Sequence, residues 1–273
     1  MEKISVFGGT GFVGSEFCKQ YSDDVIIIDR NSTEPQSNKV LYLISTVDNY
    51  NVLNDSFIDI DTNLTHLMKV LDNCKNKDIE FTFISSWFVY GDTDLPAKEE
   101  SVCKPKGFYS ITKYAAEQLL ESYCKTFNIK YNIIRLGNVV GKTDDKVSKK
   151  KNALQYLLSE LKNNNNINLY YDGEFFRDFI HVSDVASGIR FIMDNGVDGE
   201  TYNLGSGKPV LFKDVIDYAY NKIGSSSVIG TMDATDFHKI VQVKSMYLDT
   251  NKINKLGWFP SKNLTQTIDS LLW

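Results

Sequence analysis

The sequence predicts an α/β fold, in which a doubly wound parallel sheet is covered by helices on both faces and followed by a smaller C-terminal lobe. Two observations indicate this class. Strand patterns alternate with helix patterns through the first half of the chain, and the strand patterns are almost continuously apolar. Such strands are typical of parallel sheets that helices bury on both faces. A chain of 273 residues is long enough for one such domain and a smaller lobe.

The expected elements follow one another along the chain. Apolar, β-branched runs predict strands at 3–7, 25–28, 40–45, 81–86 and 131–136. Apolar residues at helical spacing predict helices at 15–21, 61–74, 110–127 and 153–162. A strand that leads into a helix is expected within 176–195 and again within 202–220.

The chain changes character after Gly141, where a polar, loop-like stretch begins. We therefore expect one domain over 1–141, with 176–205 packing back onto it, and a smaller lobe made of 142–175 and 206–273. The three lysines at 149–151 either form a solvated segment or add positive charge near an anionic ligand.

Composition excludes several classes of protein. A formal net charge of −5 and a pI near 5.3 do not fit a nucleic-acid-binding surface. No apolar run is long enough to span a bilayer, and the N-terminus lacks the pattern of a signal peptide. The four cysteines have no metal-site spacing, which indicates free thiols in a reducing compartment. We expect a cytoplasmic protein with no metal, no disulfide, no nucleic acid and no membrane partner.

A glycine-rich loop, FGGTGFVGS at 7–15, follows the first strand and opens the first helix. Gly8, Gly11 and Gly14 would provide a tight turn, a close approach of the backbone to a pyrophosphate, and close packing of the helix on the strand. The phosphates would then lie at the N-terminus of the helix, beside Phe12 and Val13. The loop predicts a Rossmann-like domain that binds a dinucleotide.

An acidic residue, Asp29, ends the second strand about 20 residues after Gly8. A carboxylate there accepts hydrogen bonds from the adenosine ribose and repels a 2′-phosphate, which favours NAD as the cofactor. Arg30 follows directly and can accommodate that phosphate, so NADP stays open.

Candidate catalytic residues follow the dinucleotide loop. Ser85 and Ser86 end a predicted strand, and the carboxyl ends of strands in a doubly wound sheet border the ligand crevice. Tyr109 and Lys113 are four apart at the start of the next helix, so their side chains lie on one face. A neighbouring ammonium lowers the pKa of a tyrosine, which would make Tyr109 a general base. Tyr218 and Lys222 have the same spacing, but no serine-ended strand precedes them, so we interpret them as structural.

These residues resemble the extended short-chain dehydrogenase/reductase family, in its nucleotide-sugar epimerase/dehydratase branch. The matching segments occur in the family's order over nearly the whole chain: GGTGFVG, ISSWFVYGD, YSITK, IIRLGNVVG, YYDGEFFRDFIHVSDVA, YNLGSG and LGWFP. The resemblance implies that Ser86 is the catalytic Ser/Thr, Tyr109 the acid/base and Lys113 the residue that holds the nicotinamide ribose.

The resemblance also implies a site for a nucleotide-diphosphate sugar. Ser86, Trp87, Asn138 and Arg177 are its candidate substrate-binding residues. The planar guanidinium of Arg177 suits a diphosphate, although a structural salt bridge is the alternative. The three histidines, His66, His181 and His238, gain no role from the resemblance and are expected in the scaffold or on the surface.

Two departures from the family pattern bear on function. Dehydratases of the family carry an Asp-Glu pair directly after the catalytic Ser/Thr, whereas this chain has Trp87 and Phe88, so dehydration is not expected. The segment between Asp29 and Ser45 is short, which indicates that one β-α unit is missing after the second strand and that the adenine pocket is open.

The resemblance and these departures together predict an NAD-dependent epimerase of a nucleotide-activated hexose, at C4 and through a transient keto-sugar. The alternatives are an NAD(P)H-dependent reductase of a 4-keto-6-deoxy nucleotide sugar and a non-catalytic dinucleotide sensor. The enzyme would serve polysaccharide biosynthesis. We also expect a homodimer, because the helices at 61–74 and 110–127 have apolar residues beyond one face and the family pairs them across a two-fold axis.

Overall fold

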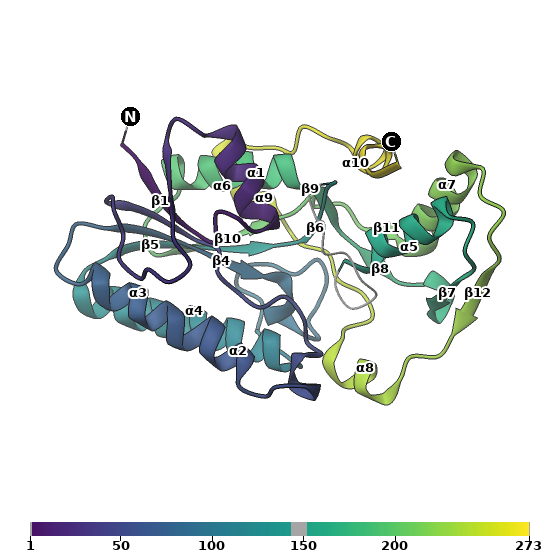
Figure 1. Ribbon diagram of the computed structural model, residues 1–273, viewed down its shortest axis with the longest axis horizontal. Helices are drawn as coiled ribbons and strands as arrows, with labels where there is room; N and C mark the ends of the chain where they lie inside the picture. Colours follow the sequence, from purple (N-terminus) through teal and green to yellow (C-terminus); the bar gives the residue numbers. More distant parts are fainter. Residues whose placement is uncertain (1, 143–151, 273) are drawn as a thin grey trace.

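The computed structural model describes residues 2–142 and 152–272 (Figure 1). The predicted lysine cluster at 149–151 lies outside these residues. The centre of the molecule is a six-stranded sheet in the order β10-β5-β4-β3-β1-β2, and every neighbouring pair is parallel. The strands are β1 (Ile4–Phe7), β2 (Val25–Ile28), β3 (Lys39–Tyr42), β4 (Glu80–Ser86), β5 (Lys130–Leu136) and β10 (Glu200–Leu204). The predicted fold class is confirmed.

Helices cover both faces of this sheet because its strands are apolar on both sides. Figure 1 shows α1 (Phe12–Gln20), α6 (Val182–Asn195) and α9 (Asn251–Leu256) on one face, and α3 (His66–Cys74) and α4 (Phe108–Phe127) on the other. Alternate side chains of β1 point to opposite faces of the sheet. Ile4 and Val6 pack against α1 and α6, whereas Phe7 packs against α3.

The helix predicted at 61–74 begins earlier and is not uniform. It runs from α2 (Ile58–Ile60) through a wider, π-type turn (Asp61–Thr65) into α3. The turn places Asn63 inside the protein, where its amide donates a 2.9 Å hydrogen bond to the hydroxyl of Thr112 on α4.

The sheet has one edge at β10 and the other at β2. The edge at β2 agrees with the predicted loss of a β-α unit after that strand. Residues 29–38 form neither helix nor strand and connect β2 to β3 on the far side of β1. The connection packs on the face of α3, where Asn73 donates to the carbonyl of Thr33 at 3.1 Å. Ser5 of β1 faces it and makes a 2.8 Å hydrogen bond with Ser37, because a small side chain leaves room for the passing backbone.

A second lobe follows β5 and contains most of the remaining elements (Figure 1, right). Its core packs α5 (Ala153–Lys162), α7 (Phe212–Ile223) and α10 (Leu264–Leu272) together. Short paired strands complete it: β6 (Asn138–Val140) with β9 (Phe179–His181), β7 (Ile167–Tyr170) with β12 (Ile229–Met232), and β8 (Phe176–Arg177) with β11 (Val210–Leu211). A short helix, α8 (Asp236–Val241), lies below these strands in Figure 1.

The assignment of residues to the two lobes differs in one respect from the expected assignment. Residues 176–205 return to the sheet through α6 and β10, as expected. However, Ile253 of α9 and Trp258, which we assigned to the smaller lobe, pack in the core of the sheet. The C-terminal segment therefore crosses back to the first domain before it ends in α10.

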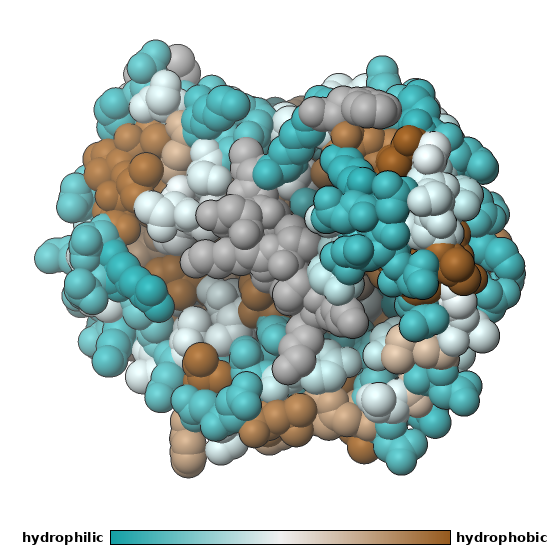
Figure 2. Space-filling view, turned by 45° about the vertical axis from the view of Figure 1, so that its right-hand side comes forward, coloured by the Kyte–Doolittle hydropathy of each residue, from teal (hydrophilic) through white to brown (hydrophobic). Residues whose placement is uncertain are grey.

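The surface is mixed in character. On the face shown in Figure 2, hydrophilic side chains are interspersed with separate apolar patches, as on the surfaces of most water-facing proteins. Within the described ranges, no helix combines the length and the apolar character needed to cross a membrane.

Candidate active site

A cavity of about 960 Å³ lies where the carboxyl ends of the central strands meet the second lobe. Ligands bind at this edge in open α/β sheets. Most of the predicted site residues line it: Gly8, Gly11, Phe12, Val13, Gly14, Ser86, Trp87, Tyr109, Lys113, Asn138 and Arg177. Residues that are distant in the sequence are thus brought to one site.

The glycine loop forms a cradle that only glycine can build. Gly8 has φ of +84°, a conformation that other residues rarely adopt. A Cβ atom on Gly14 would lie 2.2 Å from the carbonyl oxygen of Gly8, so α1 can start this close to β1 only with glycine there. The first turn of α1 borders the cavity through Phe12 and Val13. The cradle fits the pyrophosphate of a dinucleotide, which would accept hydrogen bonds from the free N–H groups of that turn.

Asp29 and Arg30 are exposed at the end of β2 and do not line the cavity. The carboxylate of Asp29 accepts a 2.9 Å hydrogen bond from the backbone N–H of Asn31. The roles of both residues toward the adenosine ribose stay predictions.

Tyr109 lies in the first turn of α4 with only 8% of its surface exposed. The start of the helix is fixed at Gly107, which is extended and whose N–H donates to the hydroxyl of Ser110 at 2.9 Å. Burial raises the pKa of the Tyr109 phenol, and the nearby hydroxyls of Ser86 and Ser45 act in the opposite direction. Ser86 and Tyr109 both line the cavity.

Lys113 differs from the expectation. Its Nζ donates a 2.6 Å hydrogen bond to the carbonyl oxygen of Ile84 and lies 4.1 Å from the centroid of the Phe83 ring. Burial lowers the pKa of Lys113 to about 7. The expected lowering of the Tyr109 pKa by this ammonium is therefore not found, and the net shift of Tyr109 is upward.

The second Tyr-Lys pair lies elsewhere. Tyr218 donates a 2.7 Å hydrogen bond to Asp269, and Lys222 lies 3.4 Å from the same carboxylate. Neither residue lines the cavity.

The residues that follow Ser86 form an aromatic wall. The rings of Trp87 and Phe88 are stacked with centroids 3.8 Å apart, and the edge of Phe88 meets Tyr109 at 5.8 Å. Ser86 Oγ accepts a hydrogen bond from the N–H of Phe88, which fixes the start of this turn. Neither ring of the wall can act as a general acid or base.

Arg177 presents a cation to the cavity. Its guanidinium donates to the backbone carbonyls of Phe176, Lys244 and Val243 at 2.7–3.1 Å. Among the described residues it has no carboxylate partner, so the alternative of a structural salt bridge is not realised. Burial lowers the pKa of Arg177 to about 10, which leaves it charged at neutral pH. The guanidinium also lies over the rings of Phe175 and Trp87, 4.6 Å and 5.6 Å from their centroids. A cation held by carbonyls and aromatic rings is well suited to an anionic ligand.

Comparisons with known proteins agree with this geometry. Residues 38–205 match the NAD dependent epimerase/dehydratase family, which is more than half of the chain. The chain belongs to this family. The relationship that the motifs predicted is confirmed, and with it the expectation of an NAD-dependent enzyme of the nucleotide-sugar class.

Individual members of the family are similar over different lengths. A putative UDP-glucose 4-epimerase of Methanocaldococcus jannaschii is 27% identical, over 97% of this chain and 95% of its own. A dTDP-4-dehydro-6-deoxyglucose reductase of Escherichia coli is 26% identical, over 67% of this chain and 57% of its own. The crystal structure of Thermus thermophilus UDP-glucose 4-epimerase in complex with NAD matches 98% of both chains with a TM-score of 0.86 at 19% identity, a likeness of fold.

Several residues of this epimerase/dehydratase site were not predicted. Tyr50, before α2, and His238, on α8, approach from opposite lobes, and the Tyr50 hydroxyl lies 2.9 Å from His238 Nδ1. The ring of Tyr170 lies 4.3 Å from that of His238. Burial and the charge of Arg177 lower the pKa of His238. We expected His238 in the scaffold or on the surface, and the structure places it at the cavity. No local motif marks a residue that tertiary packing brings to a cavity.

The other two histidines are in the scaffold as expected. His66 Nδ1 lies 2.9 Å from the hydroxyl of Tyr42, and His181 Nδ1 accepts from the N–H of Ser183 at the start of α6. The four cysteines are free thiols. In the part of the chain that the structure describes, no three His, Cys, Asp or Glu side chains are grouped as metal ligands.

Proposed function

We propose that this protein is an NAD-dependent epimerase that inverts C4 of a nucleotide-activated hexose through a transient keto-sugar. One observation carries the proposal: a single cavity contains the glycine cradle, the Ser86, Tyr109 and Lys113 group, and the guanidinium of Arg177. The first would hold the dinucleotide, the second would move a proton, and the third would bind a diphosphate.

The side chains divide the chemistry among themselves. When bound, NAD would supply a hydride acceptor that later returns the hydride. Tyr109 would take the proton from the sugar hydroxyl during oxidation and return it to the ketone oxygen during reduction. Ser86 would donate a hydrogen bond to the same oxygen, and Lys113 would bind the nicotinamide ribose.

The substrate would lie across both lobes. The first domain would hold the cofactor, and the smaller lobe would hold the nucleotide. Arg177 and Lys244 line the cavity on the side of the smaller lobe and can bind the diphosphate, and Asn138 lines the same cavity and would contact the sugar. The wall of Trp87 and Phe88 would pack against the apolar face of the sugar ring. Elimination is not part of the proposal, because neither aromatic residue can act as an acid or a base.

The runner-up is an NAD(P)H-dependent reductase of a 4-keto-6-deoxy nucleotide sugar. The exposed positions of Asp29 and Arg30 at the edge strand favour it, because an open adenosine end would let the cofactor exchange after every turnover. The similarity to the Escherichia coli reductase is in line with this alternative. A non-catalytic sensor is less favoured, because Ser86, Tyr109 and Lys113 are all present at the cavity.

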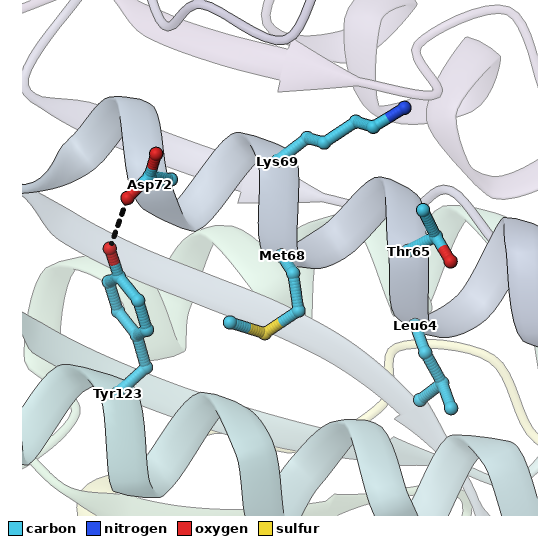
Figure 3. Close-up of a pocket in the computed structure, with 6 residues that line it drawn as sticks. All are labelled: Leu64, Thr65, Met68, Lys69, Asp72 and Tyr123. Atoms are coloured by element: carbon cyan, nitrogen blue, oxygen red, sulfur yellow. Dashed lines mark hydrogen bonds between the residues drawn. The ribbon is translucent and has the colours of Figure 1, made fainter.

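The proposal includes a homodimer formed through α3 and α4. Figure 3 shows the shallow groove between these helices, into which Leu64 and Met68 project beside a 2.9 Å hydrogen bond from Tyr123 to Asp72. Beside the groove, α4 exposes Phe108, Ile111 and Leu119 by 40–47%. A two-fold axis would cover these apolar side chains with the same helices of a second copy.

The setting proposed for the enzyme is the cytoplasm, in polysaccharide biosynthesis. Free thiols at all four cysteines support a reducing compartment.

The test is to follow the absorbance of reduced nicotinamide while purified protein reacts with single nucleotide hexoses and NAD. An epimerase interconverts two sugars with no net change in reduced cofactor, and a reductase consumes one reduced cofactor per keto-sugar. If neither reaction occurs with a panel that varies the base and the sugar, the enzymatic proposal fails and the sensor remains.

A further inference from the structure

A single carboxylate, that of Glu160, lines the large cavity. The other charged side chains that line it in the described part of the chain are the cations Lys113, Arg177 and Lys244. No salt bridge printed by these residues' geometry includes Glu160, and its Oε2 accepts one hydrogen bond, at 3.3 Å, from the side chain of Asn165. A carboxylate repels a diphosphate, so Glu160 is suited to a different part of the ligand, one that has hydrogen-bond donors.

Glu160 ends a stripe of side chains along α5. The members of this stripe recur at helical spacing and all line the cavity: Ala153, Tyr156, Leu157 and Glu160. The hydrogen bond from Asn165 places the carboxylate beside the turn that enters β7. The stripe thus leads from the middle of α5 to a negative charge at the end of the helix.

The part of the cavity formed by α5, β7 and β12 has the composition of a site for a nucleobase. Tyr170 and Met232, from the paired strands β7 and β12, offer an aromatic and an apolar surface, and Asn168 offers an amide. Proteins hold a flat base between such surfaces and read its edge with polar groups. Glu160 is the charged group at this part of the cavity.

The inference rests on the proposed function, which places the sugar at Tyr109 and the diphosphate at Arg177. In Figure 1, β7 and β12 lie farther from the central sheet than β8, which contains Arg177. A nucleotide sugar that extends from Tyr109 past Arg177 would therefore bring its base to α5, β7 and β12.

The edges of the bases differ in what they offer to a carboxylate. Guanine, cytosine and adenine have an exocyclic amino group, whose N–H donates. Uracil and thymine have carbonyl oxygens at that edge, and a carbonyl oxygen that faces a carboxylate is repelled and gains no hydrogen bond. We propose that Glu160 selects a nucleotide sugar whose base has an exocyclic amino group, from which its carboxylate accepts a hydrogen bond.

Titration calorimetry with nucleoside diphosphates tests this specificity without turnover. The purified protein is titrated with GDP, CDP, ADP, UDP and dTDP. We expect at least one of the first three to bind about tenfold or more tightly than UDP and dTDP, which is about 1.4 kcal/mol. Glu160→Gln should remove most of this difference, because an amide can donate to a carbonyl as well as accept from an amino group.

Glu174→Gln is the matched control. It removes an equal charge from the same lobe, where Glu174 lies 3.9 Å from Lys213 and does not line the cavity, so the ratio of affinities should stay that of wild type. Binding of UDP or dTDP by wild type as tight as that of GDP, CDP and ADP overturns the inference and leaves the proposed function intact. An unchanged ratio in Glu160→Gln overturns it in the same way, whereas absence of binding by all five would overturn the inference and the proposed function together.

Discussion

The ammonium of Lys113 donates a 2.6 Å hydrogen bond to the carbonyl oxygen of Ile84 while only 2% of the lysine is exposed. The bond is the only hydrogen bond of that ammonium among the described residues, so two of its three donors have no partner there. Its pKa falls from 10.5 to about 7 as a result of burial. The site is therefore built around a cation that the fold alone does not stabilise fully.

Lys113→Met should change how stability depends on pH. Between the folded pKa of about 7 and the ordinary value of 10.5, the unfolded chain binds more protons than the folded protein. The free energy of unfolding is therefore highest above pH 10.5, the ordinary pKa of lysine. It falls as the pH falls toward 7, by at most about 1.4 kcal/mol per pH unit. Urea unfolding at about pH 7.5 and about pH 9 should show this slope in wild type and lose it in Lys113→Met. An equal slope in both proteins would contradict the lowered pKa of Lys113; exposed Lys125→Met is the control.

Tyr109→Phe should lower turnover by about 10² or more while leaving the fold and dinucleotide binding intact, because it removes only the hydroxyl that moves the proton. Steady-state rates and thermal unfolding are the measurements. Tyr218→Phe removes a hydroxyl bonded to Asp269 outside the cavity and should keep its rate. Near-normal turnover in Tyr109→Phe would refute the catalytic assignment.

Arg177→Lys should raise the KM for the nucleotide sugar by about tenfold or more with a smaller change in kcat. A lysine keeps the charge but loses the planar fork that pairs with phosphate oxygens. Arg190→Lys is the control, since Arg190 pairs with Asp24 and Asp194 away from the cavity. If both variants have the same KM as wild type, Arg177 does not bind the diphosphate.

Asp29→Ala should reduce a preference for NAD over NADP. The exposed carboxylate at the end of β2 would repel a 2′-phosphate, and its loss leaves Arg30 to attract one. Titration calorimetry with both dinucleotides measures the ratio. Wild type that binds NADP(H) at least about tenfold more tightly, or about 1.4 kcal/mol, would favour the reductase over the epimerase.

Leu119→Glu should convert a dimer to a monomer, because it places a charge among the apolar side chains that the two-fold contact would bury. Sedimentation equilibrium at micromolar concentration gives the mass. Phe259→Glu changes a more exposed apolar residue elsewhere and should leave the mass unchanged. A monomeric wild type would exclude the proposed dimer at that concentration.

The parts of the fold that sequence could predict are those with a local pattern. The apolar runs became β1 to β5, and the glycine cradle follows from its spacing and its place between strand and helix. The boundaries were less exact: β3 ends at Tyr42 rather than at 45, and the helical segment before Cys74 begins at Ile58. The π-type turn at 61–65 interrupts the 3.6-residue period there, so the pattern could not show the earlier start.

The site was predictable only where a residue sits in a motif. Ser86, Tyr109 and Arg177 have such contexts, whereas Tyr50 and His238 meet only because the two lobes pack together. Spacing placed Tyr109 and Lys113 on one face of a helix but could not show that the lysine turns toward Ile84. Side-chain direction in a buried site depends on neighbours from other elements, which no local pattern contains.

The free edge at β2 is a place where the sheet could be extended by further strands. An exposed edge strand offers unpaired backbone groups to other chains, and this one limits the hazard by being four residues long and by ending in Asp29 and Arg30. No residue of the connection at 29–38 is buried, although Ser37 and Thr33 bond it to the body. It is therefore a natural insertion point, where a strand and a helix could be grafted to extend the sheet outward without disturbing the order of the strands inside it.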